Sequence, residues 1–167
     1  MEDFIYNQYT IPKDKWRYGL RSSAATGCGW IATYNALKLM GRSSEPEDLI
    51  RTYTHQVPLI NGNLGTVFFG PALLFRKWGY AVKVHVRRED FDQAAKNADA
   101  SILFYRWFKK CKCGAHFIAL SHGETGFTGY NVYRNSKGPD YLGSSLSGFI
   151  KRRKYFGTVL FTIQQPQ

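Results

Sequence analysis

The sequence predicts an α+β domain, in which the helices of the first half pack on an antiparallel sheet built mainly from the second half. Apolar residues recur at helical spacing over residues 28–40, whereas strands with period-two alternation begin at residue 81. Helices that precede strands in chain order are typical of α+β folds. With 167 residues, 44% of them hydrophobic, the chain can fill the core of one domain, and we expect a single domain over residues 1–167.

The first half predicts an extended arm followed by three helices. Residues 1–25 lack clear periodicity, and we expect them to lie over the domain as an N-terminal arm. The first helix is expected over residues 28–40, where a glycine can end it. A capping-box pattern predicts a second helix over residues 45–54, and a proline followed by a closing glycine predicts a short one over residues 72–78. An Asn-Gly-Asn sequence at residues 61–63 predicts a turn.

The second half predicts strands, with two short helices between them. Alternation of valines with polar residues begins this region, and apolar runs separated by turn residues continue it. The expected elements are, in order, a strand at 81–87, a helix at 88–97, strands at 101–108, 116–122 and 129–135, a helix at 144–155 and a strand at 157–163.

Composition excludes several classes of protein. Three cysteines cannot form a disulfide framework, and no run approaches the roughly 18 apolar residues of a membrane span. The first fifteen residues contain no apolar signal segment, so we expect a cytoplasmic protein, or one whose leader is not part of the sequence. The net charge of +11 suggests an anionic partner but does not define any chemistry.

Cys28 is the candidate nucleophile. It stands between Gly27 and Gly29 at the predicted start of the first helix, where the helix dipole favours the thiolate. The small neighbours leave room for a substrate to approach. The alternative is an inert buried cysteine, because free cysteine is among the most buried residue types. A partner histidine is therefore needed to support the catalytic interpretation.

His116 is the candidate partner, because it opens an apolar strand that a short loop joins to the next strand. If Ser121-His122 pairs with Gly129-Tyr130, His116 faces Asn135. Directly opposed residues have Cβ atoms about 4.5–5.5 Å apart, which allows an amide to orient an imidazole. Asn131 would lie roughly 13 Å along the strand and would be too distant. Cysteine, histidine and asparagine form the nucleophile, base and orienting group of papain-like chemistry.

The motifs around these three residues occur in a known order. Cys28-Gly29 opens the first helix and Gly41 closes it, His116 lies in the strand Gly114-Ala115-His116-Phe117-Ile118-Ala119-Leu120, and Tyr133-Arg134-Asn135-Ser136 follows. In this order the sequence resembles papain-like cysteine peptidases. It is most similar to the branch of peptidase domains that remove double-glycine leaders from bacteriocins. The resemblance covers nearly the whole chain.

The resemblance implies a papain-like fold and the hydrolysis of a peptide or amide bond through a thioester. Cys28 would be the nucleophile, His116 the base and then the acid, and Asn135 the residue that orients the imidazole. It implies a peptide or protein substrate, which the basic charge would bias towards acidic sequences, and no cofactor and no metal. The cleft would be bordered by Gly27, Trp30, Gly114 and Ala115.

Two positions depart from the pattern of this branch. Its members carry a glutamine about six residues before the nucleophile that donates to the oxyanion, whereas the equivalent residue here is Ser22. The backbone N–H of Cys28 remains a donor, and the hydroxyl of Ser22 or Ser23 is a candidate substitute. The usual Asp-Pro pair is Asn135-Ser136 here, and asparagine can still orient an imidazole.

Other features suggest different functions. Cys111, Cys113 and His116 are possible zinc ligands, but a Cys-x-Cys spacing is short for a structural zinc site, and we favour a loop with reduced thiols. Aromatic and basic residues are interleaved over residues 104–110, and residues 151–154 form a basic run. Nucleic acid could bind such surfaces, but we favour a strand with a basic edge and a solvated helix face. The alternative function is a catalytically silent papain-like domain that binds nucleic acid or an acidic protein through its basic faces.

Overall fold

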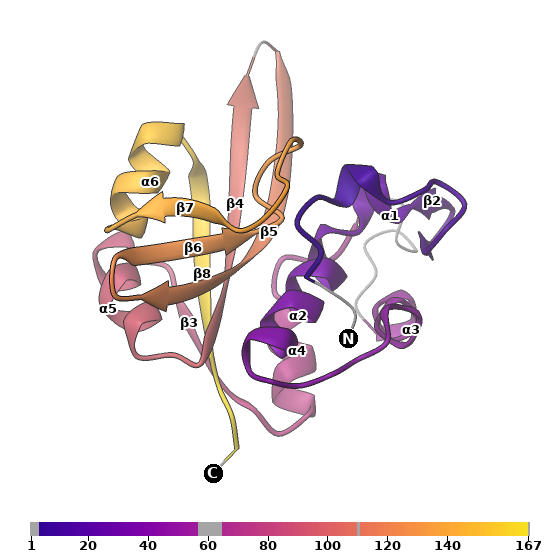
Figure 1. Ribbon diagram of the computed structural model, residues 1–167, viewed down its shortest axis with the longest axis horizontal. Coiled ribbons are helices and arrows are strands. Elements are labelled where there is room, and N and C mark those ends of the chain that lie inside the picture. Colours follow the sequence, from indigo (N-terminus) through magenta and orange to yellow (C-terminus); the bar gives the residue numbers. More distant parts are fainter. Residues whose placement is uncertain (1–3, 57–64, 110, 167) are drawn as a thin grey trace.

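A computed structural model describes residues 4–56, 65–109 and 111–166, and it has helices on both faces of one central sheet (Figure 1). The helices on one side are α1 (Ser23–Thr26), α2 (Cys28–Leu39), α3 (Pro46–Gln56) and α4 (Gly70–Lys77). Those on the other side are α5 (Phe91–Lys96) and α6 (Leu146–Arg153). The mixed α+β class is therefore confirmed. None of the helices in the described ranges combines the length and hydrophobicity that crossing a membrane requires.

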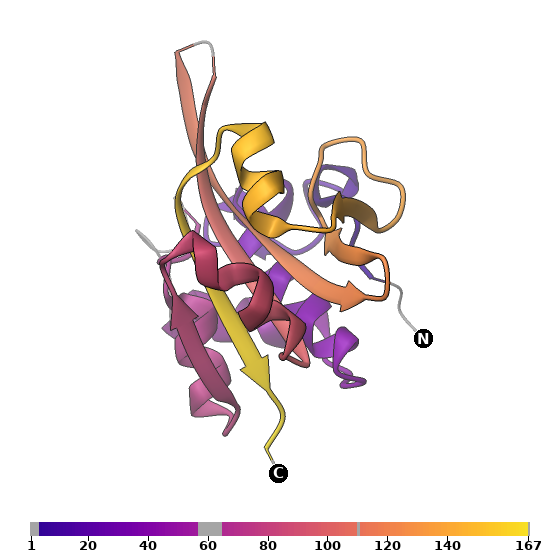
Figure 2. The same cartoon turned by 90° about the vertical axis from the view of Figure 1, so that its left-hand side faces the viewer.

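The central sheet has six antiparallel strands in the order β3-β8-β4-β5-β6-β7. The β4–β5 hairpin extends well beyond the rest of the sheet (Figure 2). The strands are β3 (Ala81–His85), β4 (Ala100–Lys109), β5 (Lys112–Gly123), β6 (Gly126–Tyr130), β7 (Asp140–Gly143) and β8 (Phe156–Gln164).

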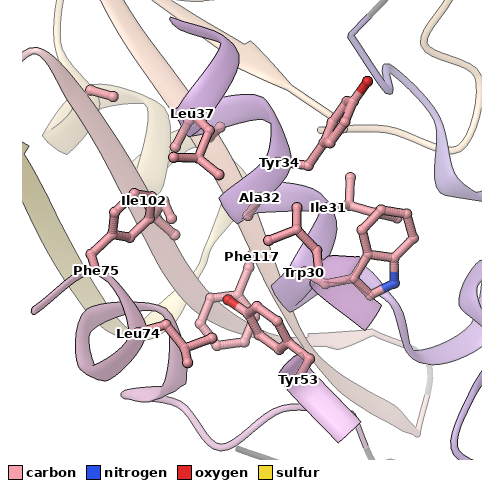
Figure 3. Close-up of a cluster of buried hydrophobic side chains, with 14 of the residues drawn as sticks. Trp30, Ile31, Ala32, Tyr34, Leu37, Tyr53, Leu74, Phe75, Ile102 and Phe117 are labelled. Carbon is pink, nitrogen blue, oxygen red and sulfur yellow. The ribbon is translucent and has the colours of Figure 1, made fainter. Parts of the chain in front are cut away.

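Alternation along β4 and β5 divides the core into two hydrophobic clusters, one on each face of the sheet. Ile102 and Phe117 belong to the cluster that contains α2, α3 and α4 (Figure 3). Leu103 and Ile118, the next residues along each strand, belong to the cluster with α5 and α6. Most of α2 is buried, as expected for a helix that is apolar nearly all round.

The three helices predicted in the first half are confirmed. The first of them is α2, and Gly41 follows its end with a φ of +71°, a left-handed conformation that favours glycine. The others are α3 and α4. Within the predicted N-terminal arm, the structure has a short 3-10 helix, η1 (Gln8–Thr10), and a two-stranded sheet of β1 (Arg17–Tyr18) and β2 (Arg21–Ser22). The predicted turn at residues 61–63 lies outside the described residues.

The strand predicted at 129–135 is wrong in position, because the loop before it is shorter than expected. Gly123 pairs directly with Gly126, so β6 begins there, and Leu120 pairs with Gly129. The register differs from the predicted one by two residues, a shift that leaves each side chain on its expected face. The strand ends at Tyr130. β7 was not expected, and the other predicted strands are present with bounds that differ by a few residues.

The N-terminus of α2 is fixed by a close contact with a distant segment. Thr66 packs against Gly29, where a Cβ atom would overlap the threonine side chain. The Thr66 hydroxyl also lies 3.2 Å from the hydroxyl of Tyr18, within hydrogen-bond distance. These contacts hold the segment after residue 64 over the first turn of α2.

We expect Gly29→Ala to lower the free energy of unfolding by about 1–3 kcal/mol, because an added methyl group would overpack the contact with Thr66. Gly138→Ala is the matched control, since a Cβ atom there would meet nothing within 4 Å. It should change stability by less than about 0.5 kcal/mol. Urea unfolding measures both, and equal effects of the two substitutions would contradict the packing described here.

Candidate active site

Cys28 is the first residue of α2 and is half-buried. The short helix α1 precedes it, and the N–H of Gly27 donates to the carbonyl of Ser23 at 2.9 Å, which joins the two helices tightly. Cys28 also lines a pocket of about 470 Å³. The predicted position of the thiol at a helix start is therefore confirmed, and the structure adds an open space beside it.

Burial dominates the electrostatics of this thiol. It raises the pKa of Cys28 from 9.0 to about 11, because the charged thiolate is poorly solvated there. Backbone hydrogen bonds from Phe117, Gly29 and Cys28 itself act in the opposite direction but are weaker. At neutral pH the resting protein therefore holds a thiol, and not the thiolate that a position at a helix start favours.

His116 hydrogen-bonds to a backbone carbonyl that follows β6. Its Nε2 lies 2.7 Å from the carbonyl oxygen of Asn131. A carbonyl can only accept, so Nε2 carries the proton, and a neutral ring then has its free lone pair on Nδ1. Burial lowers the pKa of His116 below 6.5, although the bond to Asn131 opposes this effect. The imidazole is therefore neutral at pH 7, with Nδ1 available as a base.

Asn131 is itself held by a pair of amide hydrogen bonds to Gln8. The Gln8 N–H donates to Asn131 Oδ1 at 2.8 Å, and Asn131 Nδ2 donates to Gln8 Oε1 at 3.0 Å. The remaining donor, Gln8 Nε2, reaches the carbonyl of Ala24 in α1 at 3.0 Å. Asn131 has a φ of +63°, a left-handed conformation that asparagine tolerates better than most residues. These bonds connect the N-terminal arm, the helix before Cys28 and the carbonyl that binds His116.

The predicted pairing of His116 with Asn135 is wrong. The β5–β6 register is shifted by two residues and β6 ends at Tyr130, so Asn135 lies in an exposed turn beyond the strand. Its side chain makes no hydrogen bond to another described residue. Asn131, which the predicted register placed too far away, instead provides the partner of the imidazole through its backbone. The catalytic role of Asn135 stays a prediction without the geometry on which it rested.

The helix that begins at Cys28 packs on β5, the strand that contains His116. The backbone of Phe117, the residue that follows His116 in the chain, lies near enough to the thiol to lower its pKa. The side chain of Phe117 faces α2, whereas the His116 ring packs at 5.8 Å from the ring of Tyr105, which belongs to the opposite cluster. Within the described part of the chain, no hydrogen bond joins the thiol directly to the imidazole.

The other predicted site residues have different surroundings. Ser23 is buried, donates to the carbonyl of Trp16 and accepts a 3.1 Å hydrogen bond from the indole of Trp30. Trp30 is thus a core residue and does not border the pocket. Ala115 does line the pocket, whereas Gly27 and Gly114 do not. Ser22 directly precedes α1 and is partly exposed.

Several residues at the site are not indicated by the sequence pattern. The segment Gly65–Phe69, together with Arg21 and Arg106, lines the pocket. A pair of phenylalanines after a predicted turn is the one local signal for the segment, and nothing in the sequence connects the two arginines. Gln8 is only the nearest glutamine before Cys28, too distant along the chain to indicate a contact.

Cys111 and Cys113 lie exposed at the end of the β4–β5 hairpin. Across residues 4–56, 65–109 and 111–166, no group of three or more histidine, cysteine, aspartate or glutamate side chains comes together in a way that could hold a metal ion. His116 therefore has no neighbouring set of metal-binding side chains in these ranges.

Comparison with known proteins gives no identity for this site. No family model matches the chain, and no curated protein matches it significantly. The function is therefore inferred from the chemistry and geometry of the residues described above.

The buried neutral state of His116 predicts acid sensitivity. Its pKa is lower in the folded protein than the 6.5 of the unfolded chain, so the unfolded state binds more protons below that pH. The associated stability is complete above pH 6.5 and is lost as the pH falls through the lowered pKa, with a limiting slope of about 1.4 kcal/mol per pH unit. Urea unfolding between pH 7 and pH 4 measures it.

His116→Gln should reduce this slope, because the glutamine amide can still donate to Asn131 but does not titrate. His122→Gln, an exposed position on the same strand, is the control and should leave the slope unchanged. If both variants kept the wild-type pH dependence, His116 would not be the buried neutral group described here.

Proposed function

We propose that this protein is a papain-like cysteine hydrolase that cleaves peptide or amide bonds, with Cys28 as nucleophile and His116 as base. One observation carries the proposal. The hydrogen bond from His116 Nε2 to the Asn131 carbonyl leaves Nδ1 as the basic nitrogen, in the residue directly before Phe117, whose backbone lowers the pKa of the Cys28 thiol. A nucleophile together with a base that a third group orients is the usual arrangement for nucleophilic catalysis. The His116 ring packs on Tyr105, in the cluster on the other face of the sheet from α2, so the reaction requires the ring to turn towards the thiol.

The reaction follows from this arrangement. The Cys28 sulfur attacks the substrate carbonyl while its proton passes to Nδ1 of His116. The resulting imidazolium donates from Nε2 to the Asn131 carbonyl and then gives its Nδ1 proton to the leaving amine. This step breaks the C–N bond and leaves an acyl thioester on Cys28. Water, deprotonated by the same nitrogen, hydrolyses the thioester and restores the thiol.

The proton is transferred during attack and not before it. The thiol has a pKa of about 11 and the imidazole a pKa below 6.5, so the neutral pair is the stable resting form. Catalytic hydrogen bonds are often absent or long without substrate and shorten when it binds. We therefore expect substrate in the pocket to bring the thiol and Nδ1 together.

The start of α2 provides one hydrogen-bond donor for the oxyanion that forms when the substrate carbonyl is attacked. The backbone N–H of Cys28 belongs to the first turn of the helix, where N–H groups have no partner within the helix. Gln8 donates its side-chain amide to Ala24, and Ser23 is occupied by Trp16 and Trp30. Ser22 is the predicted side-chain donor that has no such side-chain contact, and it is our candidate for the second donor.

We expect peptide cleavage to depend on both proposed catalytic residues. A mixture of peptides from a digested proteome, analysed by mass spectrometry for new termini, provides an assay that does not require the substrate to be identified first. Cys28→Ala and His116→Ala should each lower cleavage by at least about 1,000-fold. The catalytic role predicted for Asn135 is tested in the same assay: we expect Asn135→Ala to keep activity within about threefold, and a loss comparable to His116→Ala would restore that role.

The pH profile should distinguish a neutral pair from a preformed ion pair. With a base that is neutral above pH 6.5 and a thiol of pKa about 11, kcat/KM should be nearly constant from pH 7 to pH 10. A preformed thiolate–imidazolium pair would instead lose activity as the imidazolium loses its proton. Circular dichroism at each pH controls for unfolding. A fall of more than tenfold between pH 8 and pH 10 in folded protein would contradict the neutral pair.

The raised pKa of Cys28 also favours a second candidate, a domain of the same architecture without catalysis. Its partner would be nucleic acid or an acidic protein, and residues 151–154 at the end of α6, all exposed, would contribute to binding. This candidate predicts no cleavage in the peptide assay. It also predicts that Cys28→Ala binds an anionic partner as well as the wild type does.

A further inference from the structure

The pocket beside Cys28 combines an apolar wall with two arginines. Its volume of about 470 Å³ is in the range of pockets that bind small ligands. A pocket of this size can also hold one side chain of a peptide together with the adjacent residues of that peptide. The lining residues are Arg21, Ala25, Thr26, Cys28, Gly65, Thr66, Val67, Phe68, Phe69, Phe104, Arg106, Ala115 and Phe117. Arginine is thus the only charged residue type among them.

Aromatic side chains form the apolar wall. The rings of Phe104 and Phe117 are 4.9 Å apart, on neighbouring strands, and Phe68 packs on Phe104 at 6.2 Å. Phe68 is 47% exposed and the adjacent Phe69 is 43% exposed, so aromatic surface at the pocket is open to solvent. A substrate with a large apolar group would cover this surface.

The two arginines approach the pocket from different parts of the fold. Arg21 belongs to β2 on the helical side, and Arg106 belongs to the β4–β5 hairpin. The Arg106 guanidinium lies 6.0 Å from the centre of the Phe104 ring, and its stem lies over Gly157. Neither arginine forms an ion pair or a side-chain hydrogen bond with another residue of the described ranges. Both are exposed, so their charges are available to a ligand.

We infer that the substrate carries a large apolar side chain together with a nearby carboxylate, as in a peptide with an acidic residue beside a bulky apolar one. The apolar side chain would lie on Phe68, Phe104 and Phe117, and the carboxylate would bind Arg21 and Arg106. Guanidinium groups suit this role, because they hydrogen-bond carboxylates in a bidentate manner and stack on aromatic rings. The inference rests on the proposed function, since it names the substrate of the same pocket.

Charged thiol reagents test the electrostatic part without any catalysis. The protein used is Cys111→Ser/Cys113→Ser, so that Cys28 alone reacts. The second-order rate constant is measured with an anionic methanethiosulfonate, sulfonatoethyl, and with the neutral methyl compound. The ratio of the two rates removes the effect of the thiol pKa. We expect this ratio to exceed that of N-acetylcysteine and to fall about threefold in each of Arg21→Gln and Arg106→Gln.

Lys96→Gln is the matched control, because it removes one exposed charge from α5 on the other side of the sheet. This substitution should leave the rate ratio within about 1.5-fold of the value for the starting protein. In the starting protein, which retains both arginines, 0.5 M salt should lower the ratio. A ratio equal to that of N-acetylcysteine, or one unchanged by both arginine substitutions, would overturn the inference. Because no substrate is cleaved, this result does not depend on whether the proposed hydrolysis occurs.

Peptides test the apolar and acidic parts together. For peptides cleaved in the proteome assay, kcat/KM is compared between pairs that differ by glutamate against glutamine next to the apolar residue. We expect the glutamate form to be preferred at least about fivefold, and Arg106→Gln to lower kcat/KM for the glutamate form more than for the glutamine form. Cleavage without any preference for the acidic member would overturn the substrate assignment and leave the proposed hydrolysis intact.

Discussion

The packing of the buried helix α2 against β4 and β5 is the constraint on which the rest of the structure depends. Because α2 is apolar on nearly every side, it must be covered by the sheet on one side and by α3 and α4 on others. Its first turn is fixed by the contact of Gly29 with Thr66. This packing brings the Cys28 thiol to the backbone of Phe117 and leaves the pocket beside it open.

A chain of hydrogen bonds extends from the imidazole to the N-terminal arm. His116 donates to Asn131, Asn131 pairs with Gln8, and Gln8 donates to Ala24 just before the nucleophile. The arm is therefore part of the proposed site, because it holds the loop whose carbonyl orients the base. A backbone carbonyl can replace an asparagine or aspartate side chain in this role, because each of these groups accepts a hydrogen bond from Nε2 and stabilises the imidazolium.

Local signals made part of this site predictable. Gly41 ends α2 in a left-handed conformation, and such helix signals depend on neighbours in the sequence. The predicted position of Cys28 at the start of that helix was therefore correct. The predicted β5–β6 register was not, because Gly126, with a φ of +137°, permits a tighter loop than the residue types alone indicated. The contacts of Gln8 and the position of both arginines at one pocket depend on tertiary packing and have no local signal.

The neutral, Nε2-protonated state of His116 is the feature on which the proposed mechanism depends. Nitrogen-15 NMR of histidine-labelled protein at pH 7, with the resonances assigned through His116→Gln, measures the protonation of each ring nitrogen directly. We predict a proton on Nε2 and none on Nδ1, since the Asn131 carbonyl can only accept. A proton on Nδ1, in either the other neutral tautomer or the imidazolium, would contradict the mechanism, because the ring could then not accept the proton of the Cys28 thiol.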